Sequence, residues 1–188
     1  MQVAELRCSR EGIAMKKELL CMILLCVGSI SFSLAQTSST TKASAGFDKL
    51  KSLAGDWEGT FAWSGGRNAS GKMDAQYYTT GKGSAIVENL IQEGTPVMTT
   101  VYHLDGDDLR MTHFCAAQNQ PRLKATAFEA DGNGVTFSFV DITNLRSLIA
   151  GHVHSLEVRF LDADHITLKF HFKADKESDE LIDLRRKK

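Results

Sequence analysis

The segment Val101–Cys115, "VYHLDGDDLRMTHFC", has the pattern of two β-strands joined by a tight turn. The turn-forming residues "DGDD" separate two runs in which polar and apolar side chains alternate, as is typical of a β-hairpin. Pairing Leu104 with Leu109 places Tyr102 and His113 on the same face of this hairpin. Because that face carries more apolar side chains than the other, we expect it to face the protein interior.

Hairpin signals recur along the rest of the chain, where "GKG", "DGNG" and "DADH" each separate two short alternating runs. Several short strands at this spacing indicate an all-β sandwich or barrel. We expect a single antiparallel up-and-down β-barrel of about nine or ten strands. The expected strands are residues 56–63, 72–80, 84–92, 97–104, 109–116, 122–130, 135–141, 154–161, 166–172 and 179–186.

Residues 1–35 have the features of a secretory signal peptide. Lys16 and Lys17 precede an apolar run, and the small residues of "SLA" end at Ala35, where we expect cleavage. Met15 is the expected true start, because signal peptides seldom begin with a mixed polar segment. The apolar run is short for a membrane span, so we expect an exported protein, periplasmic or secreted, with no stable span after cleavage.

Residues 36–46 are polar and small, and we expect a flexible linker there, followed by the barrel domain over residues 47–188. Phe47, Leu50 and Leu53 recur at three-residue spacing, which predicts a short helical turn before the first strand.

Charge and cysteine content exclude some classes of protein. After Ala35 the chain has 18 basic and 20 acidic residues, and its basic residues are scattered, so nothing indicates nucleic-acid binding. Cys115 is the one cysteine beyond the expected cleavage site, so we expect a buried thiol and no disulfide within the domain.

Three histidines are predicted to lie on apolar faces. In "GHVHSLEVRF", strict alternation places His152 and His154 on the same side as Leu156, and His113 lies on the inner face of the first hairpin. A packed sandwich core has no room for such groups unless each is hydrogen-bonded. A barrel of eight or more strands can instead enclose a cavity that they line.

The hairpin around "DGNG" supplies an aromatic inner face. Pairing Phe128 with Phe137 brings Phe139 onto the same face, which continues back along the strand to Arg122. Aromatic walls with a basic residue at one rim are typical of a ligand-binding mouth. The candidate ligand-binding residues are therefore Tyr102, His113, Arg122, Phe128, Phe137, Phe139, His152 and His154.

Several of these segments carry a family resemblance. "LAGDWEGTF" is similar to the Gly-x-Trp opening of calycin-type barrels, the lipocalins and their relatives. Over about residues 47–172 the chain resembles a family of secreted bacterial lipocalin-like domains of unknown function, although Phe170 stands where that pattern has Trp. The matching elements are Tyr102–Asp107, Thr112–Cys115, Asn119–Arg122, His152–His154 and Asp162–His165.

This resemblance implies a calycin-type barrel, and it implies no particular activity. The nearest functional analogue is nitrobindin, a small barrel that binds haem through one histidine, and the analogy is one of fold alone.

We expect a barrel that binds a small apolar or amphipathic molecule. The first alternative is a haem or metal protein that uses His113, His152 or His154. Residues two apart on a strand lie roughly 6.6–7 Å apart at Cα, so His152 and His154 could converge on a metal with His113 as a third ligand. In the haem version one histidine binds the iron and Arg122 pairs with a propionate.

Two simpler interpretations stay open. In the first, the histidines only hydrogen-bond at a cavity rim. In the second, the barrel serves a structural or partner-binding role without a ligand. Catalysis has the least support, because the sequence contains no nucleophile elbow, phosphate-binding glycine loop or metalloprotease helix motif.

Overall fold

The computed structural model describes residues 41–147 and 150–188, so the expected signal peptide lies outside the described residues. The described part contains helix α2 (Lys42–Lys51), a short 3-10 turn η1 (Gly81–Gly83) and ten strands. The strands are β1 (Gly55–Gly65), β2 (Ser70–Thr80), β3 (Ala85–Gln92), β4 (Thr95–Asp105), β5 (Asp108–Phe114), β6 (Gln120–Phe128), β7 (Gly134–Thr143), β8 (His152–Asp162), β9 (His165–Lys173) and β10 (Ser178–Arg186). None of the helices among these residues has the length and apolar character needed to cross a membrane.

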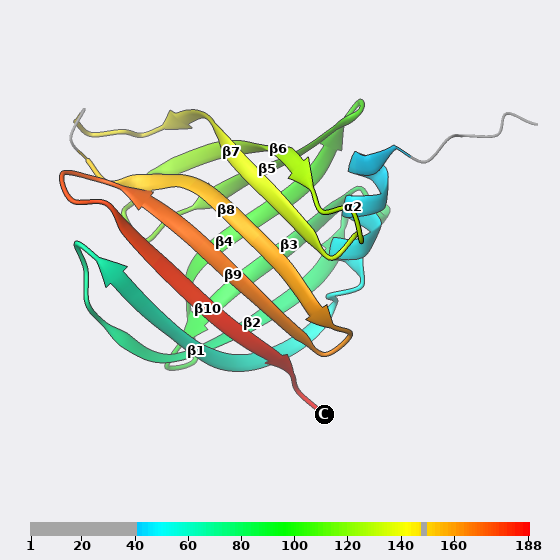
Figure 1. Cartoon of the computed structure of the whole chain (residues 1–188), viewed down its shortest axis with the longest axis horizontal. Helices are drawn as coiled ribbons and strands as arrows, with labels where there is room; N and C mark the ends of the chain where they lie inside the picture. The colour runs from blue at the N-terminus through cyan, green and yellow to red at the C-terminus, as the bar shows by residue number, and fades with distance from the viewer. Residues whose placement is uncertain (1–40, 148–149) are drawn as a thin grey trace, which may run out of the picture. The chain divides into compact units, whose positions relative to one another are not determined.

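The ten strands form one closed antiparallel barrel (Figure 1). Each strand pairs with the next along the chain, and β1 pairs with β10 to close the sheet. Closure gives every strand a neighbour on both sides, so the sheet has no edge strand of the kind found in an open sheet. The expected up-and-down barrel is confirmed.

The β4–β5 hairpin has the predicted register. Leu104 pairs with Leu109, and Thr100 pairs with His113. Tyr102 and His113 are both fully buried, so the face that carries them is the inner one.

The β6–β7 hairpin departs from the predicted register. Phe128 pairs with Val135 rather than with Phe137, and the ladder shifts by one residue between Ala125 and Ala127. This β-bulge reverses the alternation of β6, because an extra residue moves every following side chain to the other face.

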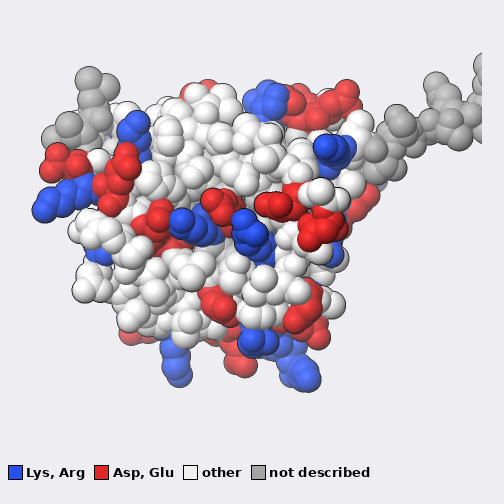
Figure 2. Space-filling view, in the orientation of Figure 1, with Lys and Arg blue, Asp and Glu red and all other residues white. Residues whose placement is uncertain are grey.

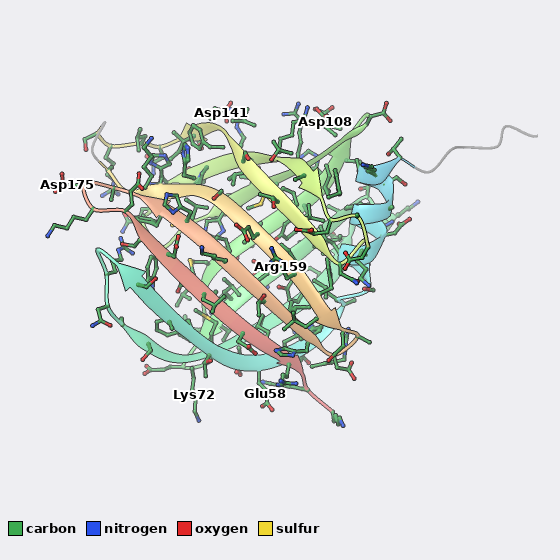
Figure 3. The ribbon with its side chains drawn as sticks, viewed as in Figure 1. Glu58, Lys72, Asp108, Asp141, Arg159 and Asp175 are labelled. Atoms are coloured by element: carbon green, nitrogen blue, oxygen red, sulfur yellow. The ribbon has the colours of Figure 1, made fainter. Side chains whose placement is uncertain are left out.

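Arg122 is the residue most affected by this bulge. The buried positions of β6 are Pro121, Leu123 and Ala125, and Arg122 lies on the exterior. Its guanidinium donates a hydrogen bond of 2.7 Å from Nη2 to Asp141, which lies at the outer edge of the barrel in Figure 3. The prediction that Arg122 lies on an inner, ligand-facing surface is therefore wrong.

A second bulge interrupts the start of β8. Val153 pairs with Phe172 and Ser155 pairs with His171, which leaves His154 as the extra residue. Val153 is buried at this end of the strand, whereas His152 and His154 are half-buried. Strict alternation through this segment was the wrong expectation, because the bulge transfers the inner position to Val153.

Helix α2 begins within the segment that we expected to be a flexible linker. Thr41 caps it, because the Thr41 hydroxyl accepts a 3.1 Å hydrogen bond from the backbone N–H of Ser44. The buried side of α2 packs into the hydrophobic core, where Phe47 and Leu50 are almost fully enclosed. Gly46 of this helix lies against Phe128, the last residue of β6. Helix α2 therefore covers one end of the barrel (Figure 1).

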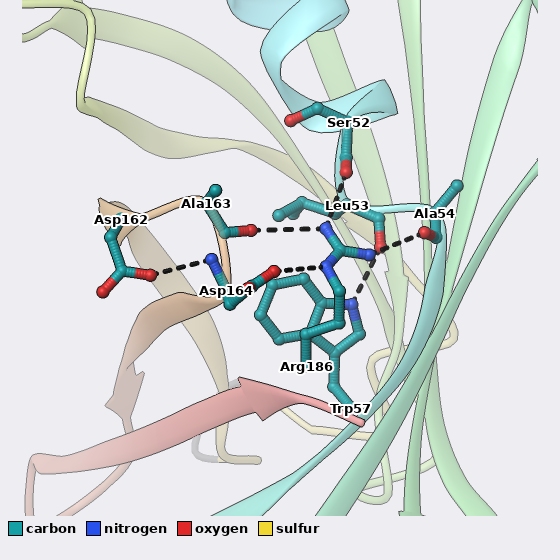
Figure 4. Close-up of polar contacts among 8 residues, drawn as sticks. All are labelled: Ser52, Leu53, Ala54, Trp57, Asp162, Ala163, Asp164 and Arg186. Atoms are coloured by element: carbon teal, nitrogen blue, oxygen red, sulfur yellow. Dashed lines mark hydrogen bonds and ion pairs between the residues drawn. The ribbon is translucent and has the colours of Figure 1, made fainter. Parts of the chain in front are cut away.

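Arg186, the last residue of β10, hydrogen-bonds to two other segments of the chain (Figure 4). Its guanidinium donates to the carbonyls of Ser52 and Ala54 at 2.9 and 2.8 Å and to the carboxylate of Asp164 at 3.0 Å. The same group lies 4.4 Å from the ring of Trp57, whose indole N–H donates to the Leu53 carbonyl at 2.8 Å.

Charged side chains are scattered over the exterior. On the face shown in Figure 2, Lys and Arg are interspersed with Asp and Glu. In Figure 3, Lys72 projects away from the barrel wall.

Candidate functional site

A cavity of about 360 Å³ opens at the end of the barrel away from α2. Strand β5 runs between the two ends: it begins beside α2, near Leu109, and its far end leads to Cys115 at the cavity. The cavity is lined by Trp63, Arg67, Gln92, Val97, Met98, His113, Cys115, Ala116, Ala117, Val153, Phe170, Phe172 and Glu180. Most of these side chains are apolar, as in other small-molecule sites, and a few polar groups lie among them.

The floor of this cavity adjoins a row of buried polar residues across four strands. Tyr77 on β2 pairs with Glu88 on β3, Glu88 pairs with Thr100 on β4, and Thr100 pairs with His113 on β5. All four are buried. Directly opposed residues on one face of a sheet lie within contact distance, so the register itself brings these groups together.

Glu88 accepts three hydrogen bonds from hydroxyl groups. Tyr77 and Tyr102 donate to its Oε2 at 2.8 and 2.9 Å, and Thr100 donates to its Oε1 at 3.1 Å. Burial raises the pKa of Glu88, and these hydrogen bonds oppose that rise. Burial also raises the pKa of both tyrosines well above its ordinary value, so each phenol keeps the proton that it donates.

His113 lies at the other end of the row, where it faces the cavity. Its Nδ1 lies 2.9 Å from the Thr100 hydroxyl, and its ring packs against Phe170, with centroids 5.1 Å apart and planes tilted by 38°. Burial lowers the pKa of His113 to about 4, so the ring is neutral at physiological pH. Its buried Nε2 has no hydrogen-bond partner among the described residues.

Glu180 contributes a second buried carboxyl group to the cavity wall. It pairs with Trp63 on one side and with Phe170 on the other, and only 3% of its surface is exposed. Burial raises the pKa of Glu180 to about 7, although the positive charge of Arg67 opposes the rise. Arg67 also lines the cavity, with its guanidinium 4.0 Å from the ring of Phe172 and 4.6 Å from that of Trp63.

The structure separates the predicted ligand-binding residues into groups. Of them, His113 alone lines the cavity. Tyr102 and Phe137 are fully buried beneath it, with ring centroids 5.7 Å apart, and Phe128 packs beside α2 at the other end. Their role in ligand binding stays a prediction.

His152 and His154 form a cluster of their own. Their rings lie 5.8 Å apart, and both pack against Phe139 at 5.1 and 5.2 Å. Neither histidine is among the residues that line the cavity with His113. Within residues 41–147 and 150–188 no group of three His, Cys, Asp or Glu side chains is placed to hold a metal ion, so the predicted convergence of three histidines is wrong.

Sequence reasoning missed the two buried glutamates. Glu88 alternates with Ile86 and Leu90 in "SAIVENLIQ", and Glu180 alternates with Ile182 and Leu184 in "SDELIDLRR". In both strands a carboxylate occupies an otherwise apolar, inward face, and this signal was available from the alternation alone.

Comparison with known proteins agrees with the fold. No protein-family model matches the chain, and no curated protein gives a significant match. Among solved structures, Rv2717c from M. tuberculosis is 15% identical with a TM-score of 0.51, over 76% of this chain and 98% of that one.

A protein of unknown function from the DUF3598 family of Nostoc punctiforme is 11% identical, with a TM-score of 0.50 over 73% of this chain. The match covers 49% of that protein, so the present chain spans about half of its length. At these identities the likeness shows a shared barrel fold and carries no function.

Proposed function

We propose that this barrel binds a small, largely apolar molecule in the cavity bordered by His113 and Glu180. The observation that carries the proposal is the buried Nε2 of His113, which borders the cavity and has no partner among the described residues. Buried polar atoms without a partner are uncommon because they lose their hydrogen bonds to water. A bound molecule with one polar group and an apolar body would satisfy this atom and cover the aromatic walls.

Substitution at the cavity mouth tests this proposal. Ala117→Trp places a bulky ring at the mouth, and Ala130→Trp places the same ring in an exposed hairpin away from it. We expect native mass spectrometry of the purified protein to detect a co-purified small molecule, or small apolar compounds to raise its melting temperature. Either signal should be lost in Ala117→Trp and kept in Ala130→Trp. Equal signals in both variants would contradict binding in this cavity.

Haem is the second candidate, because the neutral Nε2 of His113 has no partner among the described residues and could bind a haem iron. Arg67 is then the cation available for a propionate, in place of Arg122. Titration with hemin should produce a shifted Soret band in the wild type and not in His113→Ala. An unshifted band, or the same shift in both proteins, rules out this version.

We also propose that the chain is an exported, lipocalin-like protein, on the basis of the signal-peptide features of residues 1–35 and the Gly-x-Trp opening of β1. N-terminal sequencing of the protein recovered from cells that produce the full chain should give a mature chain that starts at Gln36. Recovery of the uncleaved chain in the cytoplasm would refute export.

A further inference from the structure

The hydrogen-bond row from Glu88 to His113 has a direction. A threonine hydroxyl has one proton to donate, and Thr100 donates it to Oε1 of Glu88. The contact of 2.9 Å between the Thr100 hydroxyl and Nδ1 of His113 must therefore use a proton on Nδ1. A neutral imidazole with its proton on Nδ1 has a free lone pair on Nε2, so the atom that borders the cavity is an acceptor.

We propose that Glu88, acting through Thr100, fixes His113 in its Nδ1-protonated tautomer and thereby makes the cavity selective for ligands that present an N–H or O–H donor. The selectivity rests on the proposed ligand-binding function, whereas the tautomer does not. Glu88 is a positioning residue here, because it lies behind Thr100 and does not line the cavity.

Burial raises the pKa of Glu88, but its hydrogen bonds oppose that rise and favour the ionised form that this direction requires. Both of its oxygens accept from hydroxyl groups, and all three donors are held by their own strands at hydrogen-bond distance. A carboxylate that accepts several hydrogen bonds is stabilised in its charged form. If Glu88 were protonated and donated to Thr100, the direction of these hydrogen bonds would reverse. Thr100 would then donate to Nδ1 of His113, and the ring proton of His113 would lie on Nε2.

One isosteric substitution should produce that reversal. In Glu88→Gln, the amide oxygen can replace Oε2 and accept from both tyrosines, and the amide NH₂ can replace Oε1 and donate to Thr100. The Thr100 hydroxyl must then donate its hydrogen bond to Nδ1 of His113. The imidazole becomes the Nε2-protonated tautomer, and the cavity wall changes from an acceptor to a donor.

Nitrogen NMR of the uniformly ¹⁵N-labelled protein, with no probe added, tests the tautomer directly. Signals of His113 are assigned by their loss in His113→Gln. We expect the wild type to carry the ring proton on Nδ1 and Glu88→Gln to carry it on Nε2. The same tautomer in both proteins, or an Nε2 proton in the wild type, overturns the proposal.

Two changes at Thr100 keep the test decisive if Glu88→Gln does not fold. Thr100→Ser keeps the hydroxyl and should keep the Nδ1 tautomer. Thr100→Val removes the link and should give a mixture of both tautomers. A pure Nδ1 tautomer in Thr100→Val would show that Glu88 does not control His113.

Three bicyclic probes of similar size measure the selectivity. Indole has one N–H donor, quinoline has one acceptor, and indene has neither. Because a mispaired polar atom costs more than a matched hydrogen bond contributes, we expect the wild type to bind indole about tenfold more tightly than quinoline. Glu88→Gln should reverse this order, and indene should bind both proteins equally.

Failure of the inference and failure of the proposed function give different results. Probes that bind with the same order in the wild type and Glu88→Gln overturn the inference and leave ligand binding intact. Tautomers that switch as expected, with none of the three probes bound, confirm the control of His113 and overturn the selectivity together with the proposed cavity function.

Discussion

The buried carboxyl of Glu180 makes stability depend on pH in a way that one substitution can isolate. Burial raises its pKa from an ordinary value near 4.5 to about 7 in the folded protein. Between these two values the folded state binds a proton that the unfolded state has released. The free energy of unfolding therefore falls as pH rises through this window.

The size of the effect follows from the shift. A change of one pKa unit corresponds to about 1.4 kcal/mol, so ionised Glu180 should cost the folded state about 3 kcal/mol above pH 7. Glu180→Gln keeps the shape of the side chain and never ionises. We expect it to match the wild type near pH 4.5 and to exceed it in stability by about 3 kcal/mol near pH 8.

Urea unfolding at several pH values between about 4.5 and 8 measures this difference, because the other titrating groups cancel when the two proteins are compared at each pH. Glu93→Gln, at an exposed turn, is the matched control and should differ from the wild type by less than about 0.5 kcal/mol at every pH. A stability difference for Glu180→Gln that does not change with pH would refute the reasoning.

Three further substitutions or modifications test other parts of the structure. Arg186→Ala removes several charge-assisted hydrogen bonds and should lower the free energy of unfolding, measured by urea unfolding, by about 2–3 kcal/mol. The control Arg185→Ala, at an exposed position, should change it by less than about 0.5 kcal/mol. Equal losses would contradict the role of Arg186. Gly59→Ala would press a methyl group against the Asp183 carbonyl of β10 and should destabilise by more than about 3 kcal/mol by the same assay, so a near-wild-type midpoint would contradict the close approach. Burial raises the pKa of the half-buried Cys115, so iodoacetamide should modify it more slowly than a free thiol, as mass spectrometry can measure. Equal rates would contradict this shift.

The barrel was predictable because its signals are local. Alternation of apolar and polar residues, together with turn residues such as those at Asp105–Asp108, specifies both the strands and the order in which neighbours pair. The same reasoning placed Tyr102 and His113 inside, because β4 and β5 pair without interruption.

The predictions failed where an extra residue enters a strand. Bulges near Thr126 and at His154 reverse the alternation of inner and outer side chains. For this reason the predicted positions of Arg122, His152 and His154 were wrong. Nothing in a simple period of two marks such a position, because the bulge is set by pairing with the neighbouring strand.

The cavity required a different kind of information. Its walls come from segments as distant in sequence as Trp63 and Glu180, which meet only when β1 and β10 pair. Local patterns predict that a side chain points inward, but they do not predict which other inward side chains it will meet.

Closure of the barrel by its first and last strands has a consequence for how the chain folds. Trp57 in β1 pairs with Arg186 in β10, so the final contacts join segments at opposite ends of the domain. Contacts between such distant segments form slowly, because the chain must lose the entropy of closing a long loop before these contacts can stabilise it. Until β10 arrives, β1 and β9 each present an unpaired edge, and partly folded chains with such edges associate readily. A chain shortened before β10 should therefore aggregate instead of forming a smaller barrel, and during synthesis the complete sheet can form only after its last strand has emerged.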